Sequence, residues 1–377
     1  MKLRINSKKL SKKNILKNNK VLVFSHELPP LGGGAGVVGL QYCNELYQAG
    51  FNVTLLTKKE KSYPNSLKNI RIIGAEYIPK VYLLPYVFAL MKVKLNDYDY
   101  IILNDMVAAY VAGFYFSEED LSKSTLILHG SEPEIIYDSP DIYQRITLLK
   151  FFYNKALNKV GKIIAVSNYM KSKILNETPF NDAKKIFVHY SKLGSPFFPL
   201  SNKPTKIEKT KNKEVILTVS RIEKGKGFLE MYEIFKKLIS LDNTFQWTIV
   251  GDGSFKSALV NLINKDKMNE YIKFVGKIDR NDLIYQYNNA DVFWLLSNYK
   301  ESFGLVYLEA QACYCPAVGY KKYGVIETIN NNKTGFLVEN KEQCLDIFIN
   351  REYKYFKKSD FKEFINALHL SSIKAIL

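Results

Sequence analysis

Short apolar runs alternate with longer amphipathic segments along the first half of the chain. These runs predict buried strands, which in chain order are Val21–Ser25, Asn52–Thr57, Ile70–Ile73, Tyr100–Leu103, Thr125–Leu128 and Lys162–Val166. Between the first two strands, apolar residues recur at helical spacing from Val37 to Leu46, and Gly50 follows as a C-cap. Another helix is predicted to begin near Tyr169, because Ser167 is a favourable N-cap. The alternation indicates a parallel sheet with helices on both faces.

The same alternation begins again in the second half of the chain. Its predicted strands are Val215–Val219, Trp247–Val250, Lys273–Val275 and Asp291–Leu296, and its predicted helices are Phe228–Ile239, Asp282–Asn288 and Leu305–Ala312. The segment between the halves, Leu200–Lys213, is polar, rich in Lys and contains a Pro, which is typical of an exposed linker. We therefore expect a tail at 1–20, a first unit at 21–199, a linker at 200–213, a second unit at 214–360 and a final segment at 361–377.

Charge is concentrated in two of these segments. The net charge of the 377 residues is +17, of which residues 1–20 contribute +8 and residues 200–213 contribute +4, leaving only +5 for the rest. A nearly balanced body disfavours nucleic-acid binding. The basic tail is either a solvated start of the chain or an attachment to anionic lipid head groups, and both interpretations stay open.

Membrane-spanning and metal-binding features are weak. The longest uncharged apolar run, Val81–Met91, contains Pro85 and is too short to cross a bilayer, and no secretory signal is visible. The expected location is the cytoplasm, with peripheral attachment to the inner face of the plasma membrane left open. Four scattered cysteines favour neither disulfides nor zinc, and we expect Cys313 and Cys315 to be small buried filler.

Two cations follow the first strand of the second unit. Arg221 and Lys226 come directly after Val215–Val219, and ligands of doubly wound sheets bind beyond the carboxyl ends of the strands. A guanidinium and an ammonium in that position suit a pyrophosphate, although such a pair by itself is more often surface charge.

Two glutamates flank the start of the last predicted helix. Glu301 precedes the helix Leu305–Ala312, and Glu309 lies within it. The backbone N–H groups of residues 302–304 can bind a phosphate or a sugar hydroxyl at the helix N-terminus. Carboxylates accept paired hydrogen bonds from the vicinal hydroxyls of sugars and riboses.

The order of these motifs resembles the retaining GT-B glycosyltransferases of family 4, the "glycosyl transferases group 1". The matching positions in the second unit are Val219–Arg221, Lys226–Gly227, Val250–Gly253, Phe274–Gly276, Ala290–Phe293, Ser297, Glu301–Gly304, Leu308–Ala310, Gly324, Glu327 and Thr334–Val338. The first unit matches more loosely, at Pro29–Gly36, His129–Gly130 and Val166–Ser167. The resemblance implies two Rossmann-like, doubly wound domains that face each other across a cleft, and a final helix at 361–377 that returns to the first domain.

The resemblance also implies roles for individual residues. Arg221 and Lys226 would bind the donor diphosphate, and Glu309 would hold the ribose of the nucleotide. Glu301 would address the transferred sugar together with the helix start formed by Ser302, Phe303, Gly304 and Leu305. In the first unit, the loop at Gly33 and Gly34 would close over the phosphate or acceptor, and His129 would lie near the sugar.

Four positions depart from the usual family pattern. Tyr314 stands where Gly usually follows Ala-Cys, Leu296 replaces a Pro, Tyr323 replaces the first Gly of a Gly-Gly pair, and Lys192–Gly194 replaces an Asn-Gly turn. Because these positions fall near the expected donor pocket or hinge, they can alter sugar preference or weaken activity.

Two other motifs are expected to be coincidental. Gly34, Gly36 and Gly39 match the dinucleotide-binding G-x-G-x-x-G, but they start well after the strand that should directly precede them. Asp97 and Asp99 imitate a metal-binding D-x-D, yet they precede a strand and so lie at the wrong end of the sheet for a ligand.

The function expected on this resemblance is transfer of a hexose from a UDP- or GDP-linked donor to an acceptor hydroxyl, without a metal cofactor. The expected acceptor is a glycan, or a lipid-linked one, in the synthesis of lipopolysaccharide, capsule or exopolysaccharide. Rival interpretations are a sugar-nucleotide epimerase or disaccharide phosphorylase of the same fold, and a non-catalytic protein that binds sugar nucleotides. A nucleic-acid partner is not expected.

Overall fold

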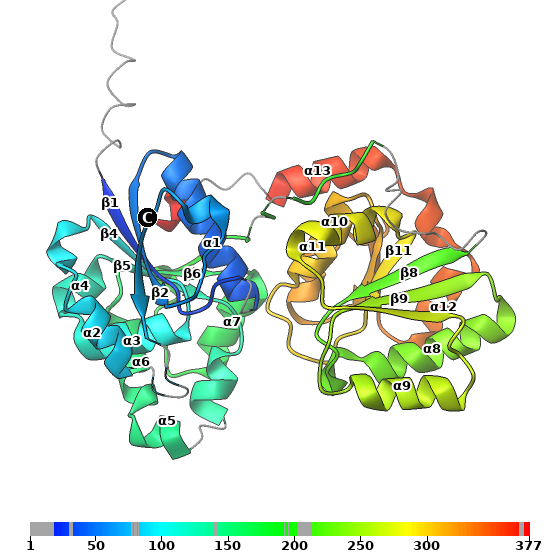
Figure 1. Ribbon diagram of the computed structural model, residues 1–377, viewed down its shortest axis with the longest axis horizontal. Helices are drawn as coiled ribbons and strands as arrows, with labels where there is room; N and C mark the ends of the chain where they lie inside the picture. The colour runs from blue at the N-terminus through cyan, green and yellow to red at the C-terminus, as the bar shows by residue number, and fades with distance from the viewer. Residues whose placement is uncertain are drawn as a thin grey trace, which may run out of the picture. The chain divides into compact units, whose positions relative to one another are not determined.

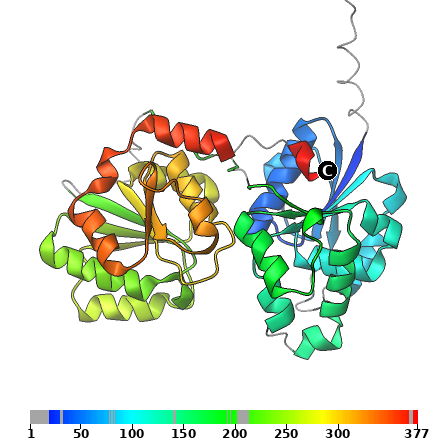
Figure 2. The ribbon, with the colours of Figure 1, turned by 180° about the vertical axis from the view of Figure 1, so that it is seen from behind.

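The computed structural model of the protein describes residues 19–29, 33–76, 78, 81, 83–138, 142–191, 193–194, 196–201, 213–368 and 373–377. The chain forms two compact units (Figures 1 and 2). The first contains Met1–Val166, Lys171–His189 and Ser372–Leu377, and the second contains Ser167–Met170 and Tyr190–Ser371. Residues 1–18 of the tail and most of the linker lie outside the described residues.

A seven-stranded parallel sheet, in the order β3-β2-β1-β4-β5-β6-β7, forms the core of the first unit. Its strands are β1 (Lys20–Phe24), β2 (Asn52–Lys58), β3 (Arg71–Ala75), β4 (Tyr100–Leu103), β5 (Ser124–Leu128), β6 (Lys162–Ala165) and β7 (Ile186–Val188). Each central strand is an apolar run because helices cover both of its faces. The order changes direction between β1 and β4, so the loops after these two strands meet at one edge of the sheet.

Helices connect these strands. They are α1 (Gly34–Gln48), α2 (Leu83–Leu90), α3 (Met106–Tyr115), α4 (Glu118–Ser122), α5 (Ile142–Ile146), α6 (Leu149–Lys159) and α7 (Asn168–Glu177). The hydroxyl of Ser167 accepts a hydrogen bond from the backbone N–H of Met170 at 2.9 Å, which confirms the predicted N-cap. Helices α2, α3 and α6 pack in sequence beside one another, and α5 contacts α6 (Figure 1).

A six-stranded parallel sheet of the order β10-β9-β8-β11-β12-β13 forms the core of the second unit. Its strands are β8 (Glu214–Val219), β9 (Phe245–Val250), β10 (Ile272–Gly276), β11 (Val292–Leu295), β12 (Ala317–Tyr320) and β13 (Gly335–Val338). The order again reverses between the first and fourth strands, here β8 and β11. Both units are therefore doubly wound, as the sequence predicts.

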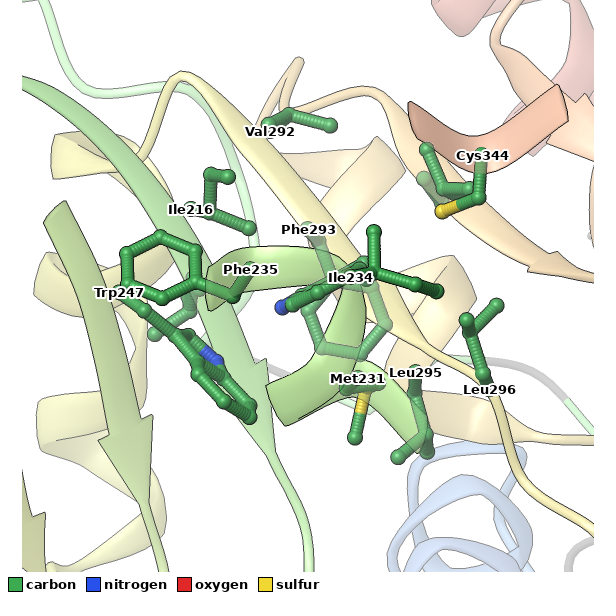
Figure 3. Packing of buried hydrophobic residues seen from close by; sticks show 14 of the residues in the cluster. Ile216, Met231, Ile234, Phe235, Trp247, Val292, Phe293, Leu295, Leu296 and Cys344 are labelled. Carbon is green, nitrogen blue, oxygen red and sulfur yellow. The ribbon is translucent and has the colours of Figure 1, made fainter. Parts of the chain in front are cut away.

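Two helical layers cover this second sheet. One contains α8 (Phe228–Leu241), α9 (Lys256–Lys265) and α12 (Lys341–Ile349), and the other contains α10 (Arg280–Asn289), α11 (Leu305–Ala312) and α13 (Lys358–Leu368). Large aromatic side chains fill the space between sheet and helices: the ring centroids of Trp247 and Phe235 are 5.6 Å apart, and those of Trp247 and Trp294 are 5.2 Å apart. Figure 3 shows Trp247 and Phe235 beside Met231 and Phe293 in this core.

The predicted strands and helices are present, with ends that differ by a few residues. Helix α10 begins at Arg280, two residues before the predicted start at Asp282. Cys313 and Cys315 are buried, as expected, and burial raises the pKa of the Cys313 thiol to about 12. Within the described residues, none of the helices has the length and hydropathy needed to cross a membrane.

Candidate active site

The reversal point of the second sheet holds the most concentrated polar cluster of the predicted site. Lys226 lies in a short 3₁₀ turn (Lys224–Lys226) after β8, and Glu301 lies in the loop after β11. Because β8 and β11 are neighbours, their loops lie side by side at the carboxyl edge of the sheet, where ligands of this fold class bind. Lys226 and Glu301 are therefore brought together although 75 positions separate them in the sequence.

Lys226 and Glu301 form an ion pair. The Lys226 Nζ atom is 2.5 Å from Glu301 Oε1, and the Ser297 hydroxyl donates to the same oxygen at 2.7 Å. The side chains of Lys226 and Glu301 are 14% and 18% exposed, so the pair is largely shielded yet still accessible. The ammonium also lies 5.4 Å from the centre of the Tyr299 ring. An anion that reaches Lys226 would enter a partly desolvated site, where charge interactions are strong.

Close backbone contact holds these two loops together. Gly227, the residue after Lys226, has a φ of 78°, and a Cβ atom there would lie 1.9 Å from the Leu296 carbonyl oxygen. The backbone N–H of Asn298 donates to the Gly225 carbonyl at 2.9 Å. Packing thus explains the glycine of the Lys226–Gly227 motif, because only glycine fits so close to the neighbouring loop.

The loop after β11 leads into α11 through Gly304, which is the N-cap and has a φ of 97°. No side chain caps this helix start. The backbone N–H groups at the start of the helix, which follows Ser302, Phe303 and Gly304, can therefore bind an anion or a hydroxyl. Leu305 is the first residue of the helix. The arrangement agrees with the expected geometry of a sugar-binding helix start, and the role itself stays a prediction.

Glu309 has partners inside the second unit. Its side chain is 2% exposed, and its carboxylate lies 2.6 Å from Arg280 Nη1 and accepts a hydrogen bond from the Tyr287 hydroxyl at 2.9 Å. Burial and the nearby carboxylate raise the pKa of Tyr287 well above its usual value. The Arg280 guanidinium lies over the Phe197 ring, 4.6 Å from its centre. A ribose would have to share the Glu309 carboxylate with these partners, and the ribose role stays a prediction.

Arg221 and Lys226 have different partners. The Arg221 side chain is 74% exposed, and its Nη1 atom pairs with Glu223 Oε1 at 2.8 Å. Lys226, five residues later, pairs with Glu301 instead. The structure places both cations in the same loop after β8 but does not test whether they bind one diphosphate.

The reversal point of the first sheet holds a second polar cluster, centred on Asn104. Asn104 follows β4 and is fully buried. Its Nδ2 atom donates to Ser25 Oγ and to the Ala35 carbonyl oxygen, both at 2.9 Å. Its Oδ1 atom is 3.2 Å from His129 Nε2. Asn104 thereby joins the loops after β1, β4 and β5 to the start of α1.

This network determines which nitrogen of His129 carries the proton. A carbonyl oxygen can only accept, so the Asn104 atom facing Ala35 must be the amide nitrogen. The Ser25 hydroxyl gives its proton to the Glu27 carbonyl at 2.8 Å and accepts from the same amide nitrogen. Asn104 Oδ1 is then an acceptor, and His129 must donate from Nε2–H. Burial lowers the pKa of His129, so the ring is neutral and its Nδ1 is a hydrogen-bond acceptor.

Buried charges fix the backbone around His129. The Glu132 carboxylate accepts hydrogen bonds from the backbone N–H of His129 at 2.7 Å and of Gly130 at 2.5 Å. Lys173, whose side chain is 1% exposed, donates to the Gly130 carbonyl and pairs with Glu134 at 2.7 Å. Sequence analysis identified His129 but missed these supporting residues, which the chain separates from it by up to 44 positions.

Asp105 and His26 form a pair of titratable groups near this cluster. The Asp105 carboxylate caps α3 by accepting from Ala108 N–H at 2.9 Å, and it also accepts from His26 N–H at 2.5 Å. Burial raises the pKa of Asp105 to about 6 and lowers the pKa of His26 to about 4. The His26 Nδ1 atom is 2.8 Å from the Tyr86 hydroxyl.

The glycine-rich segment packs against the Asn104 cluster. Gly33 is the N-cap of α1, and its N–H donates to Glu27 Oε2 at 2.7 Å, while Gly34 is the first residue of the helix. A Cβ atom at Gly39 would lie 2.6 Å from Ser25 Oγ and 2.7 Å from Asn104 Nδ2. The last glycine of the G-x-G-x-x-G match is therefore explained by helix packing. Pro30–Gly32 lie outside the described residues.

Comparison with known protein families identifies the family of this chain. A family model described as "Glycosyl transferases group 1" matches residues 201–346, and one described as "Glycosyltransferase Family 4" matches residues 32–190. The chain belongs to glycosyltransferase family 4. As a family-4 glycosyltransferase, it is an enzyme that uses a nucleotide-sugar donor. In the described part of the chain, no group of three or more His, Cys, Asp or Glu residues could hold a metal ion.

Similar proteins cover most of this glycosyltransferase. The chain is 25% identical over 330 residues to N-acetyl-alpha-D-glucosaminyl L-malate synthase of Bacillus anthracis, covering 82% of this chain and 81% of the relative. It is 30% identical over 207 residues to the capsular polysaccharide biosynthesis glycosyltransferase CapM of Staphylococcus aureus, covering 50% of this chain and 52% of CapM. At these identities, the substrates of the two relatives cannot be transferred to this chain.

The fold is that of the GT-B glycosyltransferases. The structure of Anabaena Alr3699/HepE in complex with UDP-glucose superposes with a TM-score of 0.73 at 20% identity, covering 95% of this chain and 96% of HepE. The predicted pair of doubly wound parallel-sheet domains is confirmed.

Proposed function

We propose that this glycosyltransferase moves a hexose from a UDP- or GDP-linked donor to an acceptor hydroxyl of a surface glycan, with retention of anomeric configuration. The observation that carries the proposal is the shielded Lys226–Glu301–Ser297 cluster at the reversal point of the second sheet. The similarity to CapM supports a role in surface polysaccharide synthesis, and the UDP-glucose bound to the HepE structure supports a nucleoside diphosphate donor.

In this proposal, the donor diphosphate binds at the loop after β8. Lys226 would exchange part of its interaction with Glu301 for the diphosphate, while the exposed Arg221 would turn from Glu223 to the same anion. Both cations would then stabilise the negative charge that develops on the leaving phosphate. Releasing Lys226 would also free Glu301 to accept hydrogen bonds from hydroxyls of the transferred sugar.

The transfer step needs no protein nucleophile. The acceptor oxygen attacks the anomeric carbon on the face from which the diphosphate leaves, the bond from that carbon to the phosphate oxygen breaks, and the acceptor proton passes to the departing phosphate. The products are the glycosylated acceptor and a nucleoside diphosphate. His129 contributes an acceptor at Nδ1, which suits a hydrogen bond from a sugar hydroxyl and does not suit a phosphate oxygen.

The acceptor is proposed to be a glycan or lipid-linked glycan at the cytoplasmic side of a membrane. Support comes from the eight cations and no acids of residues 1–20, which favour anionic lipid at about 1 kcal/mol per cation near the surface. Vesicle co-sedimentation of the full chain and of a form without the tail tests this part. We expect binding to weaken with added salt and with truncation.

A thermal-shift screen against UDP, GDP, ADP and their sugars tests the donor assignment, because a ligand that binds the folded state raises the melting temperature. We expect a UDP or GDP compound to give the largest increase. Product analysis with and without acceptor then separates the rivals. An altered sugar nucleotide formed without acceptor indicates an epimerase, phosphate-dependent cleavage of a disaccharide indicates a phosphorylase, and binding without turnover indicates a non-catalytic protein.

A further inference from the structure

Exposed apolar side chains gather on one helical region of the first unit. Ile142 and Ile146 on α5 are 76% and 73% exposed, and Phe151 on α6 is 63% exposed. Leu148, between these helices, and Phe114 on α3 are also exposed. We define these five side chains as the apolar face. Single exposed apolar residues are ordinary, but a group of this size usually marks a binding surface.

Helical spacing and ring contacts relate the members of the apolar face. Ile142 and Ile146 are four residues apart, so they lie on the same side of α5. Phe114 and Phe151 flank Phe152, with ring centroids 5.0 and 5.1 Å from it. Since α5 contacts α6 and α6 contacts α3, the members of the face come from three adjacent helices and the turn between two of them (Figure 1).

Helix α2, which packs against α3, and the residue that follows it present a second exposed apolar row, the α2 row. Leu84, Phe88 and Met91 follow the helical spacing of four and three residues and are 57%, 63% and 67% exposed. Pro85 and Tyr86 on the same helix are buried. Helix α2 therefore buries only one of its apolar sides in the core of the unit.

The segments that carry these residues are rich in cations, and the nearby acidic residue Glu118 of α4 pairs with Lys159 at 3.0 Å. The segment from Ile142 to Lys159 contains Arg145, Lys150, Lys155 and Lys159 and no acidic residue. Arg145 and Lys150 are exposed beside the apolar face. The α2 row is followed by Lys92 and Lys94, which are also exposed. Exposed apolar side chains flanked by cations match the interface of an anionic lipid bilayer, where cations meet head groups and apolar groups enter the acyl boundary.

A second copy of the chain is a poorer match for this surface. In a twofold dimer the same patch meets itself, so Arg145 and Lys150 of one copy would approach the same cations of the other. The segment from Ile142 to Lys159 supplies no acidic residue to face these cations, and the neighbouring Glu118 already pairs with Lys159, so charge complementarity in such a dimer would be poor.

We propose that the apolar face and the α2 row form a docking surface for anionic lipid bilayers. The surface lies within the first unit and contains no residue of the tail, and it does not depend on the proposed transfer reaction. It predicts a mode of binding that the tail alone cannot give, because shallow apolar insertion persists at salt concentrations that screen charge attraction.

The test compares vesicle binding by three forms of the full chain. The first is wild type, the second carries Ile142→Ser, Ile146→Ser and Phe151→Ser, and the matched control carries Leu241→Ser, Ile349→Ser and Tyr355→Ser, which are exposed apolar positions of the second unit. Vesicles contain equal parts of phosphatidylglycerol and phosphatidylcholine. We expect the apolar-face variant to lower the partition coefficient about tenfold or more, and the control to stay within about twofold of wild type.

Salt separates this surface from the tail. In 0.5 M salt, where the Debye length falls to about 4 Å, we expect a form without residues 1–18 to bind as well as wild type, and the apolar-face variant not to bind. Equal binding by wild type and the apolar-face variant would overturn the proposal. A wild-type dimer that the apolar-face variant converts to a monomer, with no vesicle binding by either, would assign the surface to a second copy instead.

A fluorescence measurement keeps the proposal testable if the triple variant fails to fold. The two native tryptophans, Trp247 and Trp294, are buried in the second unit, so a new tryptophan on the surface gives a separable signal. We expect Phe151→Trp to shift its emission to the blue and to be quenched by brominated lipid, whereas Tyr355→Trp stays unchanged. An unchanged Phe151→Trp spectrum on bound vesicles would contradict docking through this surface.

Discussion

The pKa values of two adjacent buried groups, His26 and Asp105, shift in opposite directions. His26 has a pKa of about 4 in the folded protein against 6.5 ordinarily, so between these values only the unfolded state binds the proton. Its contribution to the free energy of unfolding therefore rises with pH across that window. Asp105 has a pKa of about 6 against 3.8, so the folded state holds the proton there and the contribution falls as pH rises.

We predict that these two contributions, each about 3 kcal/mol, largely cancel in the wild-type protein. Asp105→Asn should leave a free energy of unfolding that rises between about pH 4 and 6.5, and His26→Asn should leave one that falls between about pH 4 and 6. Urea unfolding at a series of pH values measures both slopes. Each variant also loses hydrogen bonds, so the slope and not the absolute stability carries the test, and slopes of the same sign would contradict the assignment.

The tautomer of His129 can be measured directly. The hydrogen bonds of Asn104 require a proton on His129 Nε2, and Asn104→Leu removes that requirement. We expect nitrogen NMR of the wild-type protein to show protonated Nε2 and unprotonated Nδ1, and the variant to show a mixture of both tautomers. The chain has only four histidines, so His129→Asn suffices to assign the signal. A wild-type ring protonated at Nδ1 would contradict the network.

The two glutamates should differ in their kinetic effects. Glu309→Ala is expected to raise the donor KM, because ribose contacts persist from the ground state to the transition state, and Glu301→Ala to lower kcat, because it addresses the reacting sugar. Glu309→Ala also leaves Arg280 and the buried Tyr287 hydroxyl without this partner, so it should lower stability by about 2 kcal/mol or more. Steady-state kinetics and melting curves of both variants measure these effects. Identical changes in KM and kcat would contradict the roles assigned to the two glutamates.

At the scale of elements, the approach of α3 to α6 depends on a single glycine. A Cβ atom at Gly113 would lie 1.8 Å from the Phe152 carbonyl oxygen, so the helices could not keep their separation. We expect Gly113→Ala to destabilise the first unit by about 3 kcal/mol or more. Gly50→Ala is the matched control, since it has a φ of 92° but no atom within 4 Å of its Cβ, and strain alone should cost about 1 kcal/mol. Chemical denaturation measures both, and similar losses would contradict the packing argument.

Strands with continuous apolar runs could be predicted from the sequence because both faces of a parallel sheet are buried. β12 and β13 were not predicted as strands from hydrophobicity. They are four residues long, and Gly319 and Gly335 interrupt their apolar pattern. β7 has only three residues and lies at an edge of its sheet. Short strands are defined by their pairing with neighbours, and that pairing is not visible in the local pattern.

The candidate site shows the same division between local and long-range information. Lys226, Glu301, Glu309 and His129 follow or flank predicted elements, so their positions could be inferred. Arg280 could not, because a cation at the start of a helix usually faces solvent, whereas here it pairs with a residue 29 positions later. Its spacing of seven residues from Tyr287 puts both on one face of α10, which is the only local signal of a shared partner.

The positive φ values of two tyrosines explain why glycine is usual at their positions. Tyr314 and Tyr323 have φ values of 59° and 55°, in the left-handed region that glycine adopts without strain. The Tyr314 ring packs on Phe361 of α13, with centroids 5.8 Å apart, which offsets part of the strain. Packing thus helps to accommodate Tyr314. Among the described residues, neither tyrosine forms a hydrogen bond or an ion pair with Lys226 or Glu301.

At the scale of the whole molecule, both units place their polar clusters at the point where the strand order reverses. In the first unit that point lies between β1 and β4 and gathers Asn104 and His129, and in the second it lies between β8 and β11 and gathers Lys226 and Glu301. One fold rule thus predicts the place of both clusters, since ligands of open parallel sheets bind at such points. Family membership then identifies the reaction as transfer from a nucleotide sugar.

The measurement that tests this account most directly is calorimetric titration with the nucleoside diphosphate selected by the thermal-shift screen. We expect wild-type protein to bind it at one site and Lys226→Ala to bind it at least tenfold more weakly, a loss of about 1.4 kcal/mol or more. Lys224→Ala, an exposed lysine of the same turn, should stay within about twofold of wild type. Equal affinity for Lys226→Ala and wild type, or equal losses for both variants, would contradict the assignment of Lys226 to the donor diphosphate.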